Sequence, residues 1–234
     1  MRFYAVVLAG GVGKRMGNVG RPKQFLQLGS KPIIAHTVEK FAIHPGFERV
    51  LVLTPPEWVE NTRDILRRSL GDTDHVVVTE GGATRNDTVM ASIDWIEAHD
   101  GLDSDVVIVT HDAVRPFVSE RIIDDNLAAM ERYDACDTVV PSADTIVVSE
   151  DGGEISSIPD RRTMYRGQTP QSFRAFHLRK LYQSLDKEER VWLPDACSIF
   201  TSKGIPVGLV TGEEENIKVT YPADLRMAQA LVAE

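Results

Sequence analysis

Residues 8–26, LAGGVGKRMGNVGRPKQFL, carry side-chain types and a spacing that could bind a polyphosphate. The segment follows an apolar run at 3–8 that predicts a buried strand. Glycines let backbone N–H groups approach phosphate oxygens closely, and nearby cations neutralise the charge that the amides leave. Arg15 and Lys23 can supply those cations. The segment is therefore a candidate loop for a nucleoside triphosphate.

Two well-known phosphate loops do not match this segment. A Walker-type loop needs Ser or Thr after its Gly-Lys pair and a glycine five positions before its last one. Here Arg15 follows Gly13 and Lys14, and Leu8 occupies the earlier position. A dinucleotide fingerprint would have its third glycine at Met16, and no clean acidic strand end follows. An NAD-dependent oxidoreductase stays as an alternative that saturable NAD binding would support, and a Gly-rich turn with solvated charges is the structural alternative.

Two further polar segments follow strand-like runs. GGATRNDT contains Gly82, the cation Arg85 and the hydroxyl of Thr88 at a helix start, where ordinary helix capping is the alternative role. Asp112 follows the apolar run at 105–110 and could hold a ribose hydroxyl or a Mg²⁺ that bridges phosphates, or it could simply form a turn. Because ligands of open α/β sheets lie beyond the carboxyl ends of the strands, the three loops are expected to meet at one edge.

Other charged side chains are open to two interpretations. Arg115 could bind an anion or form a surface ion pair, and Arg161, with the arginines that follow it, could belong to a solvated face. Lys218 follows an acidic run at 213–215, so it either pairs with those acids or points into an anion site. His111 is assigned no chemical step, because a lone histidine beside a strand end is more often packed or hydrogen-bonded.

Length and charge limit the possible functions. A chain of 234 residues can form a single α/β domain, and we expect one domain over 1–234. The net charge of −9 argues against a nucleic-acid partner, which needs concentrated Lys and Arg. Cys136 and Cys197 are far apart and indicate neither a disulfide framework nor a zinc site. No leader or bilayer-length apolar run is found, so a soluble, cytoplasmic protein without a membrane partner is expected.

Apolar runs alternate with helical patterns over most of the chain. Strands are expected at 3–8, 49–54, 76–79, 105–110 and 206–211. Helices are expected at 33–42, 57–70, 86–99, 175–185, 195–203 and 223–232, and one more helix is expected from its N-cap Ser119 to residue 133. Runs such as VVIVT suit strands covered on both faces, so the predicted fold class is α/β with a mostly parallel, doubly wound sheet. Residues 137–148 and 154–158 predict a protruding hairpin, which would pack on the main body or on a second subunit.

Six ordered blocks resemble the cytidylyltransferases that attach CMP to a phosphorylated polyol. They are LAGGVGKRM with PKQFL, GGATRNDT, THDAVRPF, QTPQSF, DACSIF and NIKVTYPADL. Two such families compete: 2-C-methyl-D-erythritol 4-phosphate cytidylyltransferase of isoprenoid synthesis, and ribitol-5-phosphate cytidylyltransferase, which makes CDP-ribitol for teichoic acid or related wall and capsule polymers. The chain resembles the second more closely, because it has LAGG where the isoprenoid enzymes typically have a proline and a second alanine, and Thr88 where they have serine.

The resemblance implies a Rossmann-like three-layer nucleotidyltransferase fold and a role for each matching residue. CTP would be bound by Leu8, Ala9, Gly10, Gly11, Gly82, Arg85, Thr88 and Asp112, with Asp112 also near Mg²⁺. Arg15 and Lys23 would stabilise the charge that builds up on the α-phosphate while a phosphate oxygen of the acceptor attacks the α-phosphorus in line and pyrophosphate leaves. Arg161 and Lys218 would position the acceptor phosphate, and Arg115 and Thr145 would shape its pocket.

The resemblance also implies an assembly. A β-arm at about 138–165 would reach into a neighbouring subunit and give a homodimer with composite active sites. One residue departs from the pattern: Pro194 stands where the family usually has Thr before Asp195. This departure leaves the identity of the acceptor open, but not the type of reaction. A non-catalytic nucleotide sensor is the alternative from another class of protein, and it predicts CTP binding without turnover.

Overall fold

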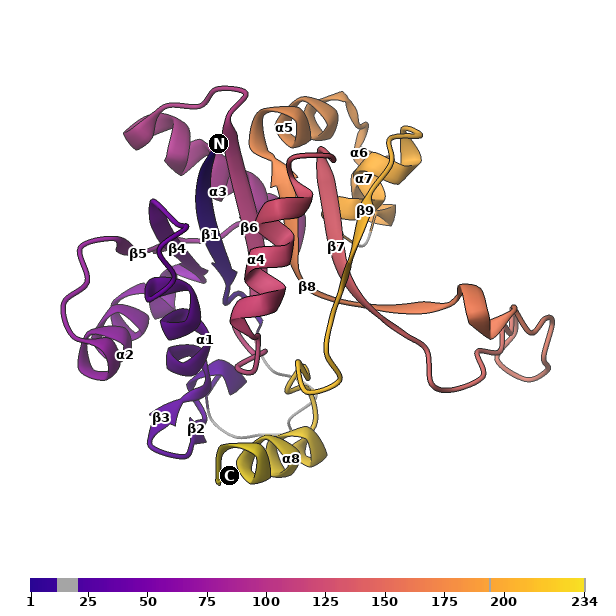
Figure 1. Ribbon diagram of the computed structural model, residues 1–234, viewed down its shortest axis with the longest axis horizontal. Coiled ribbons are helices and arrows are strands. Elements are labelled where there is room, and N and C mark those ends of the chain that lie inside the picture. Colours follow the sequence, from indigo (N-terminus) through magenta and orange to yellow (C-terminus); the bar gives the residue numbers. More distant parts are fainter. Residues whose placement is uncertain (12–20, 194, 234) are drawn as a thin grey trace.

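A seven-stranded sheet forms the centre of the molecule in the computed structural model, which describes residues 1–11, 21–193 and 195–233 (Figure 1). The strand order is β5-β4-β1-β6-β8-β7-β9. The strands are β1 (Arg2–Leu8), β4 (Arg49–Thr54), β5 (Val76–Glu80), β6 (Val106–Asp112), β7 (Ala135–Pro141), β8 (Tyr165–Arg174) and β9 (Gly208–Thr211). In this sheet β8 pairs antiparallel with β6 and β7, and the other neighbouring strands pair parallel. The predicted α/β class with a mostly parallel sheet is confirmed.

Helices cover both faces of the sheet, which explains the continuous apolar strand runs. Ala5 and Val7 of β1 join the core on one face, and Tyr4 and Val6 join the core on the other. The first core receives α1 (Ile33–Ala42), α2 (Val59–Leu70) and α4 (Glu120–Ala129), and the second receives α3 (Arg85–Asp100), α5 (Ala175–Ser184) and α7 (Ala196–Ser202). The remaining elements are α6 (Lys187–Trp192), α8 (Pro222–Ala233), the short hairpin β2 (Gln27–Leu28) and β3 (Lys31–Pro32), and the 3₁₀ turns η2 (Lys23–Phe25), η3 (Pro56–Trp58) and η4 (Arg161–Thr163).

A third apolar cluster joins the carboxyl-terminal helix to the end of the sheet. Leu28 and Ile33 pack there with Val114, Val219 and Ala228 of α8. In Figure 1, α8 lies at the opposite end of the molecule from the N-terminus, beside β2 and β3. Helix α8 is therefore packed next to the loop that follows β6.

Side chains cap the N-termini of several helices close to the helix starts that the sequence predicted. Ser119 accepts a hydrogen bond from Ile122 N at 3.3 Å and begins α4, as predicted. Thr84 and Asp87 form a capping box at the start of α3. Asp195 accepts from Ser198 N and begins α7. These caps fix the loops before them, and two of those loops carry site residues.

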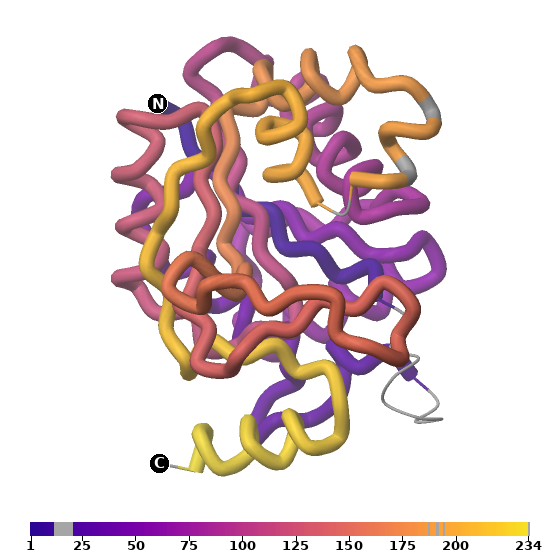
Figure 2. Tube along the Cα trace, turned by 90° about the vertical axis from the view of Figure 1, so that its right-hand side faces the viewer, coloured from indigo at the N-terminus to yellow at the C-terminus, as the bar shows by residue number. Residues whose placement is uncertain are grey.

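The predicted hairpin at 137–148 and 154–158 is wrong in part. Residues 135–141 form β7 inside the main sheet, and the polar run at 165–174 forms the ten-residue strand β8, which the sequence analysis did not predict. Between them residues 142–164 form an arm that leaves the body (Figure 1), and in Figure 2 it faces the viewer across the lower part of the sheet. The arm has one isolated β-bridge, Val148 with Ser157. We call residues 142–164 the arm.

Two negative expectations can be compared with the described part of the chain. None of the helices there combines the length and apolar character needed to cross a bilayer. Cys136 and Cys197 are both buried and free. Burial raises the pKa of the Cys136 thiol to about 12, so this sulfur has little thiolate character near neutral pH.

Candidate active site

A cavity of about 430 Å³ lies at the carboxyl ends of β1, β5 and β6. Its wall is formed by Leu8, Ala9, Gly10, Gly11, Lys23, Gln24, Gly82, Ala83, Thr84, Arg85, Thr88, Asp112, Ala113, Val114, Lys218 and Thr220. The three predicted loops therefore meet at one edge of the sheet, together with η2 and the segment before α8. All eight residues predicted to bind the nucleotide line this cavity.

Strand pairing places the acidic side chain next to the glycine loop. Leu8 at the end of β1 is the register partner of Asp112 at the end of β6. Directly beyond Leu8 and Ala9, a Cβ added to Gly10 or Gly11 would meet no atom of the described residues within 4 Å. The glycines thus leave room at the cavity wall that a larger residue would fill, as a close approach of backbone to phosphate requires.

The loop before α3 is held open by a local hydrogen-bond pattern around Thr88. Gly82 N donates to Thr88 Oγ1 at 3.1 Å, and this hydroxyl is 2.8 Å from the Thr84 carbonyl oxygen, to which it donates. A Cβ on Gly82 would lie 2.6 Å from the carbonyl carbon of Asp87. Only glycine allows this approach of the loop to the first turn of α3. Thr88 therefore shapes the loop from within the helix.

Asp112 is the centre of the charge in the cavity. Arg85 Nη1 donates to its Oδ1 at 2.6 Å, Lys218 Nζ lies 2.9 Å from its Oδ2, and Arg115 Nε is 3.4 Å from Oδ2. Burial opposes ionisation, but the three cations outweigh it and hold the pKa of Asp112 well below its usual range. Three positive side chains thus surround one negative one, and the excess positive charge suits an anionic ligand.

His111 and Arg115 form the buried support of this turn. His111 is fully buried, which lowers its pKa to about 4, so the ring is neutral near pH 7. Its Nε2 is 3.0 Å from the Arg115 carbonyl oxygen, and its Nδ1 is 2.9 Å from Thr169 Oγ1. The Arg115 side chain is also buried and donates to the Asn216 carbonyl oxygen at 2.7 Å. Desolvation by burial lowers the pKa of Arg115.

The turn η2 brings a lysine into the wall of the cavity. Lys23 is 7 % exposed, and its Nζ donates to the Val219 carbonyl oxygen at 2.8 Å. Next to it, the amide of Gln24 donates to the Ala9 carbonyl oxygen at 2.7 Å, while its Oε1 is buried without a hydrogen-bond partner among the described residues. Lys23 thus joins the end of the glycine loop to the segment that carries Lys218.

The remaining predicted residues do not line the cavity, or they lie outside the described residues. Arg115 lies behind Asp112, whereas Thr145 and Arg161 are exposed on the arm, where Arg161 Nη1 donates to the Ala143 carbonyl oxygen at 3.1 Å. Arg15 and Pro194 lie outside the described residues. The two arginines after Arg161 form surface ion pairs, Arg162 with Asp160 and Arg166 with Glu214. Of the two interpretations of Lys218, the cavity is the one the geometry supports.

Sequence reasoning missed three polar residues around this site. Gln24 lies in the quoted block PKQFL, but an isolated glutamine gives no signal of a role. Thr220 lines the cavity in the block NIKVTYPADL. Gln171 lies on β8 and contacts Arg85 from behind, with Nη2 and Oε1 3.2 Å apart. Finding Gln171 requires knowing that QTPQSF forms a strand beside β6.

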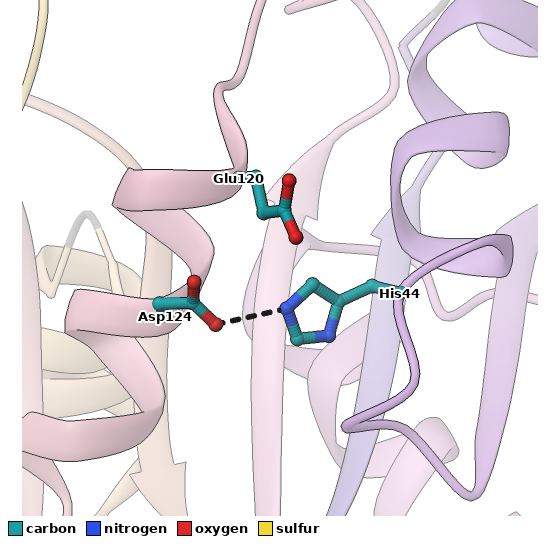
Figure 3. Close-up of side chains that lie close together, drawn as sticks. All are labelled: His44, Glu120 and Asp124. Carbon is teal, nitrogen blue, oxygen red and sulfur yellow. Dashed lines mark hydrogen bonds and ion pairs between the residues drawn. The ribbon is translucent and has the colours of Figure 1, made fainter.

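A second group of potential metal ligands lies away from the cavity, between α1 and α4. His44 Nε2 is 3.0 Å from Asp124 Oδ1, with Glu120 close by (Figure 3). Gly46 N donates to Nδ1 of the same ring at 3.1 Å. An Nδ1 that accepts a hydrogen bond carries no proton, so the proton of the neutral ring lies on Nε2 and is donated to Asp124. We interpret the group as a structural hydrogen bond between the turn that follows α1 and helix α4.

The fold and the cavity together define a nucleotidyltransferase, with a doubly wound sheet, a glycine loop after the first strand and cations around the end of β6. The chain matches the model of the family described as IspD, 2-C-methyl-D-erythritol 4-phosphate cytidylyltransferase, over residues 3–234, and it belongs to this family. The alternatives of an NAD-dependent oxidoreductase and a non-catalytic sensor are not supported by this membership.

Solved structures of named enzymes resemble the chain along its whole length. The 2-C-methyl-D-erythritol 4-phosphate cytidylyltransferase of Francisella tularensis is 26 % identical, with a TM-score of 0.79 over 98 % of this chain and 99 % of that one. The enzyme of that name from Thermus thermophilus is 27 % identical, with a TM-score of 0.70 over 100 % of both chains. A 4-diphosphocytidyl-2C-methyl-D-erythritol synthase from Anaerococcus prevotii shares the fold, with a TM-score of 0.80 at 23 % identity over 100 % of this chain and 96 % of that one.

Proposed function

We propose that this cytidylyltransferase transfers CMP from CTP to 2-C-methyl-D-erythritol 4-phosphate and releases pyrophosphate. The family model and the resembling structures carry this acceptor in their names, which supports it over the ribitol phosphate that the sequence blocks favoured. The observation that carries the proposal is the convergence of Arg85, Lys23 and Lys218 on one cavity beside Asp112. Such a site suits two anions that must be held side by side.

The reaction needs no protein nucleophile. An ionised phosphate oxygen of the acceptor attacks the α-phosphorus of CTP, a new P–O bond forms, and the bond to the β-phosphate breaks as pyrophosphate leaves. The protein accelerates this step by holding both anions in line and by placing fixed positive charge where negative charge develops. Lys23, which lies in the wall, and Arg15 are proposed for the α-phosphate, and Lys218 for the acceptor phosphate.

A divalent cation is expected for the family, and Asp112 is the residue proposed to hold it. Among the described residues that line the cavity Asp112 is the one carboxylate, and its two oxygens already contact Arg85 and Lys218. Asp112 would offer Mg²⁺ one carboxylate ligand, of the kind this ion takes in nucleotide sites, once a cation moves away from that oxygen. When bound, Mg²⁺ would neutralise charge on the triphosphate. Lys218, 40 % exposed at its side chain, has the freedom to turn from Asp112 towards a phosphate.

Ribitol 5-phosphate is the second candidate acceptor, favoured by the blocks LAGG and THDAVRPF, whereas Pro194 in place of the usual threonine favours neither acceptor. Thr88 does not help to choose, because its hydroxyl makes local hydrogen bonds that serine could also make. Proline offers no hydroxyl to an acceptor, whichever sugar phosphate is bound.

The arm supports a homodimer with composite sites. It exposes apolar side chains away from the body, namely Ile146, Val147, Val148, Ile155 and Ile158. Exposed aliphatic residues on a protruding segment are typical of a protein contact. Thr145 and Arg161 lie on this arm, outside the cavity of their own chain. A second copy could therefore receive both at its acceptor pocket.

One incubation separates the candidates. Purified protein with CTP and Mg²⁺ is given either 2-C-methyl-D-erythritol 4-phosphate or D-ribitol 5-phosphate, and pyrophosphate release is measured. We expect turnover with the first, at a kcat/KM at least about tenfold above that with the second, the ratio that corresponds to about 1.4 kcal/mol of transition-state binding. Faster turnover with ribitol 5-phosphate would reverse the assignment, and CTP binding without turnover on either would refute both acceptors.

A further inference from the structure

A chain of hydrogen bonds leads from the cavity through Gln171 to two further acids. Arg85 donates to Asp112 through Nη1 and to Gln171 Oε1 through Nη2, the latter at 3.2 Å. Gln171 Nε2 in turn lies 3.1 Å from Asp137 Oδ1 and 3.1 Å from Asp195 Oδ2. Gln171 is 3 % exposed, so these bonds form in a buried setting. The cavity is thereby connected to β7 and to the start of α7.

The amide of Gln171 can make these contacts in one orientation. Its oxygen faces a cation, and its NH₂ group faces two carboxylates. Turning the amide by half a revolution would place NH₂ against guanidinium and oxygen against carboxylate, which are repulsive contacts. Glutamate would keep the acceptor and lose the donor, and leucine would lose both. Glutamine alone among side chains of this length satisfies both sides at once.

The backbone holds Gln171 in place for this role. In β8 it is the register partner of Thr110 in β6 and of Asp137 in β7, and Thr110 Oγ1 donates to its carbonyl oxygen at 3.0 Å. Asp195 is fixed as the N-cap of α7. Arg85, in contrast, has a long side chain that is 29 % exposed in the cavity wall. The long side chain of Arg85 is thus hydrogen-bonded to a residue that strand pairing holds in place.

We propose that Gln171 is a positioning residue of the active site, whose amide holds the Arg85 guanidinium against Asp112 and so presents it to the nucleotide in a fixed orientation. This inference rests on the proposed placement of CTP beside Arg85. Preorganised donors aimed at a bound anion avoid reorganisation when the ligand arrives. A hydrogen bond that holds such a donor from behind typically changes activity without touching the substrate.

The acids beyond Gln171 explain why an amide is needed there. Burial raises the pKa of Asp137 to about 6, the hydrogen bond from Gln171 opposes the rise, and the nearby Asp195 adds to it. Two carboxylates that share one NH₂ group repel each other when both are ionised. The Gln171 donor lowers that repulsion, and a neutral residue without a donor would leave it uncompensated.

A double-mutant cycle on turnover tests the inference. We compare wild type, Gln171→Leu, Arg85→Leu and the double variant by pyrophosphate release with CTP varied at saturating acceptor. Gln171→Leu should lower kcat/KM for CTP about tenfold or more, since hydrogen bonds to charged groups have about this effect. If Gln171 acts through Arg85, Gln171→Leu should change kcat/KM less than about twofold in the Arg85→Leu background, because the interaction it would remove is already absent there.

A matched control variant separates positioning from general loss of structure. Gln168 is a buried glutamine on the same strand, and its amide donates to the Glu213 carbonyl oxygen and contacts Asn216, away from Arg85. Any fold-change in kcat/KM for CTP that Gln168→Leu causes should be the same in the wild-type and the Arg85→Leu backgrounds, so that the two fold-changes multiply in the double variant. If Gln171→Leu also multiplies with Arg85→Leu, or leaves kcat/KM for CTP unchanged, Gln171 is not a positioning residue.

Two further measurements keep the test decisive. Thermal unfolding shows whether Gln171→Leu folds, and Gln171→Met, which keeps the length of the side chain without the donor, replaces it if it does not. CTP affinity measured without acceptor repeats the cycle independently of the acceptor. If Gln171→Leu and Arg85→Leu affect CTP affinity independently, Gln171 does not act through Arg85 and the inference is wrong. If their effects on CTP affinity are coupled but neither acceptor is turned over, only the proposed acceptors are wrong.

Discussion

Lys218 and Asp112 form an ion pair with 2.9 Å between Nζ and Oδ2, although more than a hundred residues separate them along the chain. Lys218 follows β9, and Asp112 ends β6. With Arg85 and Arg115 also on Asp112, this carboxylate is the shared partner of three cations at the edge of the sheet. Its charge therefore matters for stability as well as for ligand binding.

Asp112→Asn should destabilise the protein strongly. The variant leaves buried positive charge without its partner, and breaking a buried pair from one side costs about 3 kcal/mol or more of unfolding free energy. The pKa of Asp112 is depressed in the folded state, so its contribution is present above the unfolded pKa of 3.8 and is lost as pH falls through the folded pKa. Urea unfolding at about pH 7.5 and about pH 3 should show a smaller difference from wild type at the lower pH. Equal stability of the two proteins at the higher pH would contradict the charge balance.

Lys218→Met is the matched variant for this prediction. It removes one of the three cations and keeps the aliphatic stem, and the lysine side chain is 40 % exposed. The free energy of unfolding should change by less than about 1 kcal/mol, as for a partly exposed pair. The KM for the acceptor should rise, because Lys218 is proposed to hold the acceptor phosphate.

Lys23→Met should lower kcat while the protein stays folded. The methionine fills the space of the lysine stem but removes the charge proposed to stabilise the α-phosphate. Loss of one such contact costs about 3 kcal/mol in the transition state, or roughly a hundredfold in kcat. Pyrophosphate release gives kcat, and circular dichroism confirms folding. Lys31→Met, which removes a surface ion pair with Glu39, is the control and should keep kcat near wild type. Unchanged turnover in Lys23→Met would remove Lys23 from the mechanism.

Asp137→Asn should stabilise the protein at alkaline pH. The folded pKa of about 6 lies above the unfolded value of 3.8, so ionised Asp137 costs stability as pH rises through this range. Asparagine avoids that cost, and its Oδ1 can still accept from Gln171 Nε2. At about pH 8 the gain should be on the order of 3 kcal/mol, or about 6–12 °C in Tm. Thermal scans should show the gain vanish near about pH 4, where the folded carboxyl is protonated. A gain of equal size at both pH values would point to packing instead of charge.

Charged residues on the arm should break the proposed homodimer. Ile155 and Ile158 are each 60 % exposed, so Ile155→Asp with Ile158→Asp disturbs no core packing in the described residues. Sedimentation velocity should show a dimer for wild type and a monomer for the variant. Ile43→Asp, at a 74 % exposed position after α1, should leave the dimer intact. A wild-type monomer at micromolar concentration would refute the composite site.

The first half of the fold could be predicted because local signals and tertiary structure agree there. The predicted ranges 33–42 and 49–54 coincide with α1 and β4, since a Pro precedes α1 and both faces of β4 are buried. β8 could not be predicted, because QTPQSF contains a proline and two glutamines that local patterns place in loops. Its strand character comes from hydrogen bonding to β6 and β7.

The residues of the candidate site also divide into those with a local sequence signal, which could be predicted, and those without one. Asp112, Gly82 and Lys218 could be located because each stands in or beside a distinctive polar block next to an apolar strand. Gln24 and Gln171 carry no such signal, because an amide gains a role only through the groups that tertiary structure brings to it. The buried position of Arg115 was also hidden, since burial of a charge depends on partners from distant loops such as Asn216.

The arm connects two strands that are already paired side by side in the sheet. β7 and β8 pair from Ala135 with Phe173 to Pro141 with Tyr165, while the arm between them contributes one bridge of its own. A protease cut within the arm would therefore leave two fragments that still share β7, β8 and both cores. The chain offers a natural split point, at which two separately produced halves should reassemble into the sheet.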